Sequence, residues 1–152
     1  MHETERVVDG EITLVPYDPS GQAEALAWYQ DRELCRQVDN IDRVYTRERL
    51  NTMYTFLHTH GECWFIRFNG VLVGDVSLRE KDNEIAVVIC REYQNRQIGR
   101  RCIREILRRA EEKGKTYVTA RIYSFNTQSQ RAFRSAGFRK IGEEEYRCDL
   151  TK

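Results

Sequence analysis

The stretch that decides the fold runs from Glu84 to Lys113 and reads EIAVVICREYQNRQIGRRCIREILRRAEEK. Its first part, Ile85 to Cys90, carries no charge on either strand face, which predicts a central strand covered on both faces. From Ile98 onward, apolar residues recur at the spacing of one helical face, and Lys113-Gly114 ends that helix. The stretch therefore predicts a buried strand, a tight turn and an amphipathic helix.

The turn between this strand and this helix, residues 94–99, is the first candidate binding element. A strand that leads directly into a helix points the unpaired N–H groups and the positive dipole end of the helix above the sheet, which favours phosphate. Arg96, Arg100 and Arg101 add full positive charges. The alternative is an ordinary strand–helix junction with solvated arginines, because short glycine motifs often arise by chance.

The composition is that of one domain, predicted to span residues 1–152, with 40% hydrophobic residues to build its core. A formal net charge of +1 provides no overall field for nucleic acid or an anionic membrane. No apolar run approaches membrane-spanning length, and the acidic start of the chain lacks the apolar segment of a signal peptide. We therefore expect a cytoplasmic protein without a nucleic-acid or membrane partner.

Cysteine and histidine spacing gives no metal site. The five cysteines are odd in number, widely spaced and without a C-x-x-C pair, which argues against a disulfide framework and against zinc. His58 and His60 lie two residues apart in a predicted helix, so their side chains do not face each other. We expect reduced, mostly buried thiols and surface histidines.

The N-terminal half predicts a strand, two helices and a connection. Glu11 to Pro16 is expected to be a strand, and Ser20 the N-cap of the helix after it. The polar segment from Asp31 to Val44 is expected to be a solvated connection. Thr46 and the apolar series that follows it predict a further helix, which ends near His58.

The clearest hairpin lies around Asn69-Gly70, a pair that supplies both positive-φ residues of a type I′ turn. Its strands are Trp64 to Phe68 and Val71 to Leu78, and Glu84 to Cys90 adds a third antiparallel strand. A strand from Thr116 to Tyr123 follows the long helix, and this strand–helix–strand step implies a right-handed parallel crossover.

The last elements are a helix that begins near Asn126 and ends at Gly137, and a hairpin that runs from Phe138 to Cys148. The three glutamates at 143–145 form its turn. The predicted fold class is α/β, with a mixed, mostly antiparallel central sheet flanked by helices and one parallel strand–helix–strand crossover.

Two motifs resemble those of the GNAT-type N-acetyltransferases, and the resemblance covers nearly the whole chain. The family signature, Q/R-x-x-G-x-G/A at a helix start after a strand, corresponds to Gln94-Asn95-Arg96-Gln97-Ile98-Gly99. A second element, Asn-x-x-Ser before a helix ending in Gly-Phe, corresponds to Asn126-Thr127-Gln128-Ser129 and Gly137-Phe138. Two motifs in the right order are more specific than one. Residues 27–33 and 74–78 more loosely resemble a subgroup that includes ribosomal-protein and aminoglycoside 6′-N-acetyltransferases.

The resemblance implies transfer of an acetyl group from acetyl-CoA to a primary amine of a small molecule or a protein N-terminus, by direct attack in a ternary complex. It implies that the backbone of Val87, Val88 and Ile89 pairs with the pantetheine arm, with the Ile89 N–H as a candidate oxyanion donor. It further implies a pyrophosphate site at Gln94, Asn95, Arg96, Gln97, Ile98, Gly99 and Arg100. Asn126 and Ser129 would lie beside the pantetheine and the adenosine.

Two positions depart from the family pattern. Gln97 replaces the first motif glycine, which puts a side chain where the backbone approaches the pyrophosphate. Phe133 occupies a position where many members carry a tyrosine that protonates the leaving thiolate. Either another group donates that proton, with Tyr123 and Tyr146 as candidates, or the thiolate leaves unassisted.

A primary amine is almost wholly protonated at neutral pH, so a base or a water relay accelerates its attack, typically by about 10² to 10⁴-fold. Glu84 at the start of the uncharged strand is the first candidate base, and Asp75 on the adjacent strand is the second. The alternative for both is a carboxylate in solvent. A separate hypothesis is that a cationic acceptor is attracted by a group of carboxylates, Asp31, Glu33, Asp39 and Asp42.

Two other classes of protein compete with the enzyme. A non-catalytic acyl-CoA-binding module, which binds coenzyme A without turnover, would account for Phe133 and Gln97. The arginines of the long helix suggest nucleic-acid binding, but the near-zero net charge and the lack of aromatic residues between them weigh against it. A P-loop is excluded because no Gly-Lys-Ser/Thr follows the turn. The acceptor stays open, as does the choice between a monomer and a homodimer.

Overall fold

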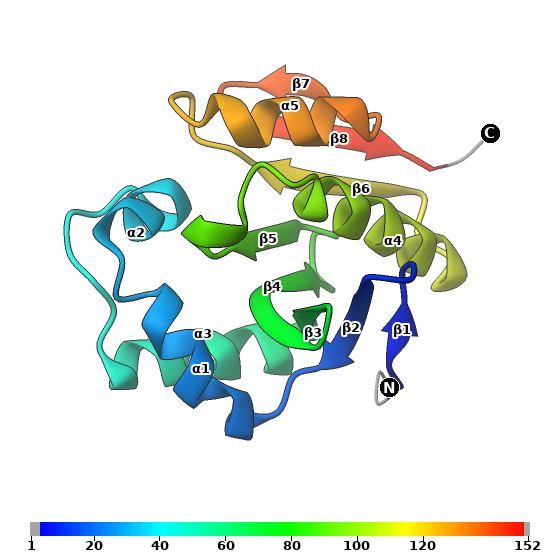
Figure 1. The fold of residues 1–152 in the computed structure, drawn as a ribbon. Coiled ribbons are helices and arrows are strands. Elements are labelled where there is room, and N and C mark those ends of the chain that lie inside the picture. The colour runs from blue at the N-terminus through cyan, green and yellow to red at the C-terminus, as the bar shows by residue number, and fades with distance from the viewer. Residues whose placement is uncertain (1–3, 151–152) are drawn as a thin grey trace.

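The chain folds into two antiparallel sheets with helices around them, in a computed structural model that describes residues 4–150 (Figure 1). The first sheet contains β1 (Arg6–Val7), β2 (Ile12–Pro16), β3 (Gly61–Phe68), β4 (Val71–Arg79) and β5 (Ile85–Ile89), in that order. The second contains β6 (Tyr117–Arg121), β8 (Glu145–Asp149) and β7 (Arg139–Gly142), in that order. The helices are η1 (Pro19–Gly21), α1 (Gln22–Trp28), α2 (Arg32–Asp39), α3 (Arg47–Thr59), η2 (Arg91–Tyr93), α4 (Ile98–Glu112) and α5 (Thr127–Ser135).

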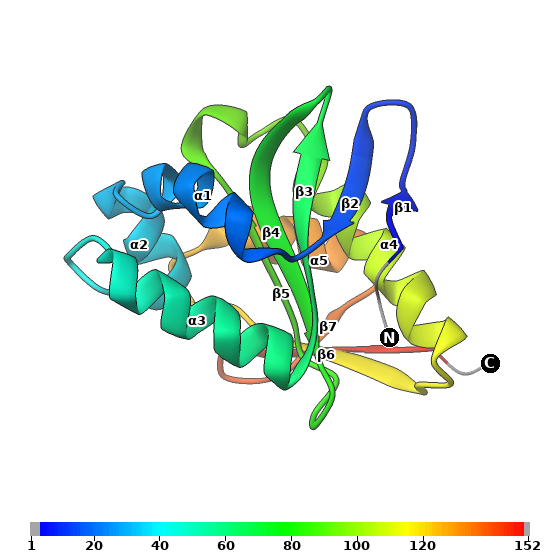
Figure 2. The ribbon, with the colours of Figure 1, turned by 90° about the horizontal axis from the view of Figure 1, so that it is seen from below.

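The helices cover the first sheet on both faces. Helices α1 and α3 lie on one face and α4 lies on the other, while α5 lies beside α4 and the second sheet (Figures 1 and 2). Side chains between these layers are fully buried, among them Leu14, Trp64 and Ile106. No helix in the described part of the chain has the length and apolar character needed to cross a membrane.

The predicted fold class is confirmed, and the hairpin at Asn69-Gly70 has the expected turn, with φ angles of 49° and 87°. The parallel crossover through α4 is present in a minimal form. Among the described residues, one isolated parallel bridge, Glu84 to Thr119, connects β5 with β6. Beyond that bridge the two strands do not pair, and the sheet divides into two.

Strand β5 is an edge strand, which corrects the prediction of a central strand covered on both faces. It pairs with β4 on one side, Ala86 is exposed, and Val87 and Ile89 are half-buried. A strand that lines a cavity lacks charge just as a fully buried strand does. The uncharged pattern therefore did not distinguish the two cases.

Two helix assignments near the N-terminus were also wrong. Asp18, not Ser20, caps the first helical turn, because the Asp18 carboxylate accepts the Ser20 N–H at 3.0 Å. The segment expected to be a solvated connection contains α2, whose N-terminal N–H groups are bonded by the Asp31 side chain. The cap at Thr46 was predicted correctly. The two-residue strand β1 was not foreseen.

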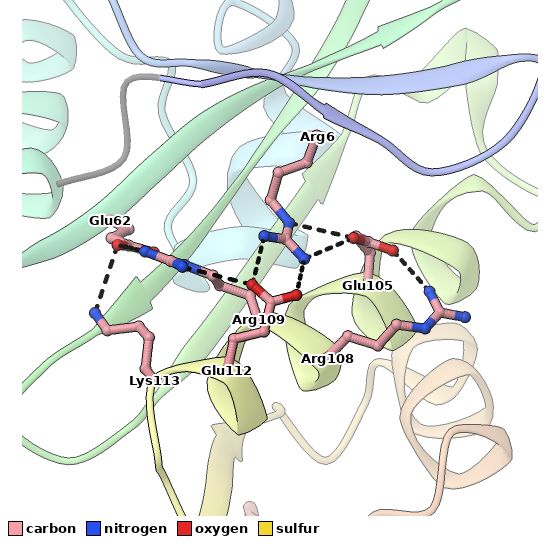
Figure 3. Close-up of polar contacts among 7 residues, drawn as sticks. All are labelled: Arg6, Glu62, Glu105, Arg108, Arg109, Glu112 and Lys113. Atoms are coloured by element: carbon pink, nitrogen blue, oxygen red, sulfur yellow. Dashed lines mark hydrogen bonds and ion pairs between the residues drawn. The ribbon is translucent and has the colours of Figure 1, made fainter.

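Helix α4 is held against the first sheet by ion pairs as well as by its apolar face (Figure 3). Glu105 and Glu62 are only 7% and 6% exposed, and each is paired with arginine. The network joins β1, β3 and α4 through Arg6, Glu62, Glu105, Arg108, Arg109, Glu112 and Lys113. These ion pairs help to fix the position of α4, and with it the turn at its N-terminus.

Candidate active site

A cavity of about 540 Å³ opens between β5, α4 and α5. Its lining contains the predicted acetyl-CoA residues Val87, Val88, Ile89, Gln94, Asn95, Gln97, Ile98, Gly99, Arg100, Asn126 and Ser129. Arg96 is the exception, because its guanidinium donates to the Glu92 carbonyl at 3.3 Å and lies over the Tyr93 ring. Residues from two distant motifs thus meet at one cavity, which we call the donor cavity.

The edge of β5 that does not pair with β4 faces this cavity. The Arg79 N–H donates to the Glu84 carbonyl and the Cys90 N–H donates to the Val73 carbonyl, both at 2.8 Å. Because backbone groups alternate in direction along an antiparallel strand, those of Val87 and Ile89 point away from β4. The Ile89 carbonyl accepts the Gln94 side-chain amide at 2.9 Å. An extended ligand can therefore add to β5 as a further strand does.

The turn into α4 leaves the first N–H groups of the helix without a side-chain cap. Gln97 occupies the N-cap position, and its side chain forms no capping hydrogen bond. A Cβ built on Gly99 would lie 3.8 Å from the nearest Ile89 atom and 3.9 Å from the nearest Val87 atom, which is ordinary contact. The fold itself would therefore accept a side chain at Gly99. The glycine instead keeps the N-terminus of α4 open to the donor cavity.

Arg100 contributes a buried donor without an acceptor. Its Nε atom is buried and has no hydrogen-bond partner among the described residues. A buried polar group left unpaired costs about 1 to 3 kcal/mol, and an anion in the cavity would remove that cost. The open edge of β5, the uncapped helix end and this guanidinium fit a ligand with an extended arm and a diphosphate.

The position of the missing motif glycine is strained. Gln97 has a φ of 62°, in the left-handed region that glycine adopts without penalty. Gln97→Gly is expected to raise the free energy of unfolding by about 0.5 to 1 kcal/mol, because relief of strain exceeds the added entropy of the unfolded chain. Urea denaturation measures the difference. Gln97→Ala is the control and should give no gain, since alanine has the same Cβ; an equal gain from both variants would contradict the assignment of strain.

A second cavity, of about 330 Å³, lies on the side of α1 and α3, and we call it the acceptor cavity. It shares part of its wall with the donor cavity through Val38, Ile85, Ala86, Val88, Arg121, Ile122 and Tyr123. The shared wall follows β5 and the end of β6, where the two strands separate. Two ligands bound in these cavities would meet there.

Asp75 forms part of the acceptor cavity and lies opposite Val88 in the β4–β5 ladder. Its side chain is 3% exposed, and the hydroxyls of Tyr29 and Tyr54 both donate to its Oδ2 atom at 2.8 Å. Burial raises the pKa of Asp75 to about 6, and the two hydroxyl donors oppose that rise. The carboxylate is thus ionised at neutral pH, and its pKa lies within the range useful for proton transfer.

Glu84, the first candidate base, also lines the acceptor cavity, but it is held by an ion pair. The Arg79 guanidinium donates to its carboxylate at 3.0 Å. Burial raises the pKa of Glu84, and the positive charge of Arg79 opposes the rise. Both candidate bases therefore line the same cavity, and of the two only Asp75 has no cationic partner among residues 4–150.

The two candidate proton donors lie in different places. Tyr123 belongs to the shared wall, its ring stacks on Phe125 at 5.5 Å, and burial raises its pKa. Tyr146 is buried in the second sheet and lines neither cavity, so the suggestion that it could protonate the thiolate was wrong. Phe133 lines the donor cavity at the position from which the tyrosine is missing.

Of the carboxylates expected to attract a cationic acceptor, only Asp39 lines the acceptor cavity. Asp31 caps α2, while Glu33 and Asp42 are paired with arginines at the surface. Tyr29 and Tyr54 were not recognised as partners of Asp75. They lie 46 and 21 residues from it along the chain, and no local pattern signals such a contact.

An open strand edge, an uncapped helix N-terminus and a second adjoining cavity meet at one place, and this arrangement fits enzymes that transfer a group from an extended donor carrying a diphosphate. The family model described as "Acetyltransferase (GNAT) domain" matches residues 11–139. The chain therefore belongs to the GNAT acetyltransferase family and is an acetyl-CoA-dependent N-acetyltransferase. The resemblance drawn from the two motifs is confirmed.

Solved structures of the same fold belong to enzymes that modify or bind different molecules. The acetyltransferase from Salmonella typhimurium that modifies the N-terminal serine of ribosomal protein L7/L12 has a TM-score of 0.81 and 12% identity, over 97% of this chain and 100% of that one. Spermidine N-acetyltransferase from Vibrio cholerae, solved with CoA and spermine, has a TM-score of 0.78 and 13% identity, over 93% and 96%. An aminoglycoside acetyltransferase with coenzyme A and kanamycin has a TM-score of 0.77 and 13% identity, over 91% and 94%. Comparison with curated protein sequences returned no match.

Proposed function

We propose that the chain binds acetyl-CoA in the donor cavity and acetylates a primary amine that enters through the acceptor cavity. The observation that supports this most directly is the wall that the two cavities share at β5. The diphosphate would lie at residues 94–100, with Arg96 as an outer charge, and the pantetheine would pair with Val87 and Ile89. Asn126 and Ser129 would border the pantetheine and the adenosine.

Acetyl-CoA would extend in one direction along β5, from the N-terminus of α4 toward Glu84. In this direction the extended arm brings the thioester to the shared wall. The amine nitrogen attacks the thioester carbon there, and a C–N bond forms while the carbonyl oxygen takes a negative charge. The N–H of Val87 points away from β4 and lies between Ala86 and Val88 of the shared wall, so it is the candidate donor to that oxyanion. The N–H of Ile89, the donor suggested by the motifs, lies nearer the α4 end of β5.

Two further side chains would move protons. Asp75 is the preferred base, since its carboxylate lines the acceptor cavity without a cationic partner, and Glu84 is the alternative. When the C–S bond breaks, the thiolate takes a proton, and Tyr123 in the shared wall is the candidate donor. The proton would then come from the connection between β6 and α5 and not from α5 itself, where Phe133 has no proton to give.

The test is acetyl-CoA turnover with a panel of primary amines, followed as free thiol release. Amine-dependent release is expected, with tight binding of coenzyme A by calorimetry. Tight binding without turnover on any amine would favour the non-catalytic acyl-CoA-binding module. We also infer a cytoplasmic location, supported by free cysteines at all five positions, and the chain would act there as a monomer or a homodimer.

A further inference from the structure

The acceptor cavity has an unbalanced charge. Four carboxylates line it, from Asp39, Asp75, Glu84 and Glu144, together with one cation, Arg121. Arg121 lies 3.5 Å from Glu145, a carboxylate outside the cavity. The remaining lining is largely apolar or aromatic and includes Val38, Met53, Leu57, Tyr29 and Tyr45. A ligand that fills this cavity therefore contacts an apolar lining and an excess of negative charge.

The four carboxylates differ in their partners. Arg49 lies 3.5 Å from Asp39 and Arg79 lies 3.0 Å from Glu84, so each of these charges is offset. Among the described residues, neither Asp75 nor Glu144 has an ion-pair partner within 4.0 Å. The uncompensated charge of the cavity is therefore confined to these two side chains.

The first of these two side chains, Asp75, is a buried part of the cavity lining. Asp75 is 3% exposed, and both of its hydroxyl donors bond the same oxygen, Oδ2. An ionised carboxylate so deeply buried is costly when its bonded partners are neutral hydroxyls alone, and a positive charge beside it lowers that cost. A cationic or amine nitrogen in the cavity would pair with it.

The second side chain, Glu144, is held by a hydrogen bond from the chain segment that follows β6. Glu144 lies in the turn between β7 and β8, and its carboxylate accepts the Ser124 N–H at 2.7 Å. That bond turns Glu144 toward the β6–α5 connection and leaves lone pairs for another donor. The fields of Glu144 and Asp39 add to burial in raising the pKa of Tyr123, so Glu144 acts on the shared wall of the two cavities.

We propose that the natural acceptor is a small aliphatic amine with a second cationic centre, whose reacting nitrogen lies at Asp75 and whose second charge pairs with Glu144. The inference rests on the proposed function and makes its acceptor specific. A volume of about 330 Å³ is at the small end for ligand sites and suits a flexible chain better than a rigid multi-ring compound. An alkyl chain between the two charges matches the apolar wall.

The experiment compares an α,ω-diaminoalkane with the monoamine of the same chain length. The wild type is expected to prefer the diamine by about tenfold or more in kcat/KM, and Glu144→Gln should bring that ratio close to one. Glu143→Gln, in the same turn but outside the acceptor cavity, is the control and should preserve the ratio. The preference should also weaken as salt is added, because part of the attraction is between exposed charges.

Equal use of the two amines by the wild type would overturn the inference, as would a ratio that Glu144→Gln leaves unchanged. Calorimetry of the diamine with the coenzyme A complex separates this failure from failure of the proposed function. Diamine binding that depends on Glu144, without turnover, supports the acceptor class and refutes catalysis. Turnover of monoamines alone supports catalysis and refutes the acceptor class.

Discussion

Asp75→Asn is expected to make the protein more stable and almost inactive at pH 7.5. Burial raises the pKa of Asp75 from 3.8 to about 6, so the folded chain holds this proton more tightly than the unfolded chain does. Stability therefore falls as the pH rises from about 4 to about 6 and stays lower above that range, by about 3 kcal/mol in total. Asparagine avoids this cost, and its carbonyl can still accept from Tyr29 and Tyr54.

Urea denaturation should show Asp75→Asn to be more stable than the wild type by about 1 to 3 kcal/mol at pH 7.5, with a smaller difference at pH 4.5. Acetyl transfer should fall by about 10² to 10⁴-fold, because the base is lost. Glu84→Gln is the matched variant, since it removes the other candidate base from the same cavity. If Glu84→Gln abolishes transfer while Asp75→Asn does not, the two roles have been assigned to the wrong carboxylates.

Gly99→Val is expected to weaken coenzyme A binding by at least about 100-fold, equivalent to about 3 kcal/mol. The side chain would occupy the space through which the α4 N-terminus reaches the donor cavity. The fold should survive, because a Cβ at Gly99 makes only ordinary contacts with Val87 and Ile89. Calorimetric titration with coenzyme A measures the loss, and a thermal melt checks the fold.

Gly10→Val provides the control for this substitution. A Cβ at Gly10 would meet nothing within 4 Å, and the residue lines neither cavity. Its coenzyme A affinity should equal that of the wild type. A folded Gly99→Val variant with unchanged affinity would mean that the diphosphate does not lie at this turn.

Local patterns predicted the parts of the fold that local forces determine. The Asn69-Gly70 turn and the amphipathic α4 both depend on neighbours a few residues away, and both are present. Helix α2 was missed because it is short and polar, and the carboxylate of Asp31 that caps it was taken for a solvated charge.

The candidate site also contains a part that local sequence patterns predicted and a part that they did not. All of the predicted acetyl-CoA residues except Arg96 line the donor cavity, since the turn and the α5 N-terminus are continuous stretches of sequence. The acceptor cavity brings Asp39, Asp75 and Glu144 together from separate elements. The edge position of β5 depends on the separation of β5 from β6, which is a property of the whole sheet. The residues of the acceptor cavity and the edge position of β5 could therefore not be predicted from spacing along the chain.

Titration of coenzyme A into ¹⁵N-labelled protein, followed by amide NMR shifts, is the most direct test of where acetyl-CoA binds. The largest shifts are expected at the amides of Val87, Ile89, Gly99 and Arg100, because these face the donor cavity or line it. Shifts that leave these amides unchanged and cluster elsewhere would contradict binding along β5 and at the N-terminus of α4.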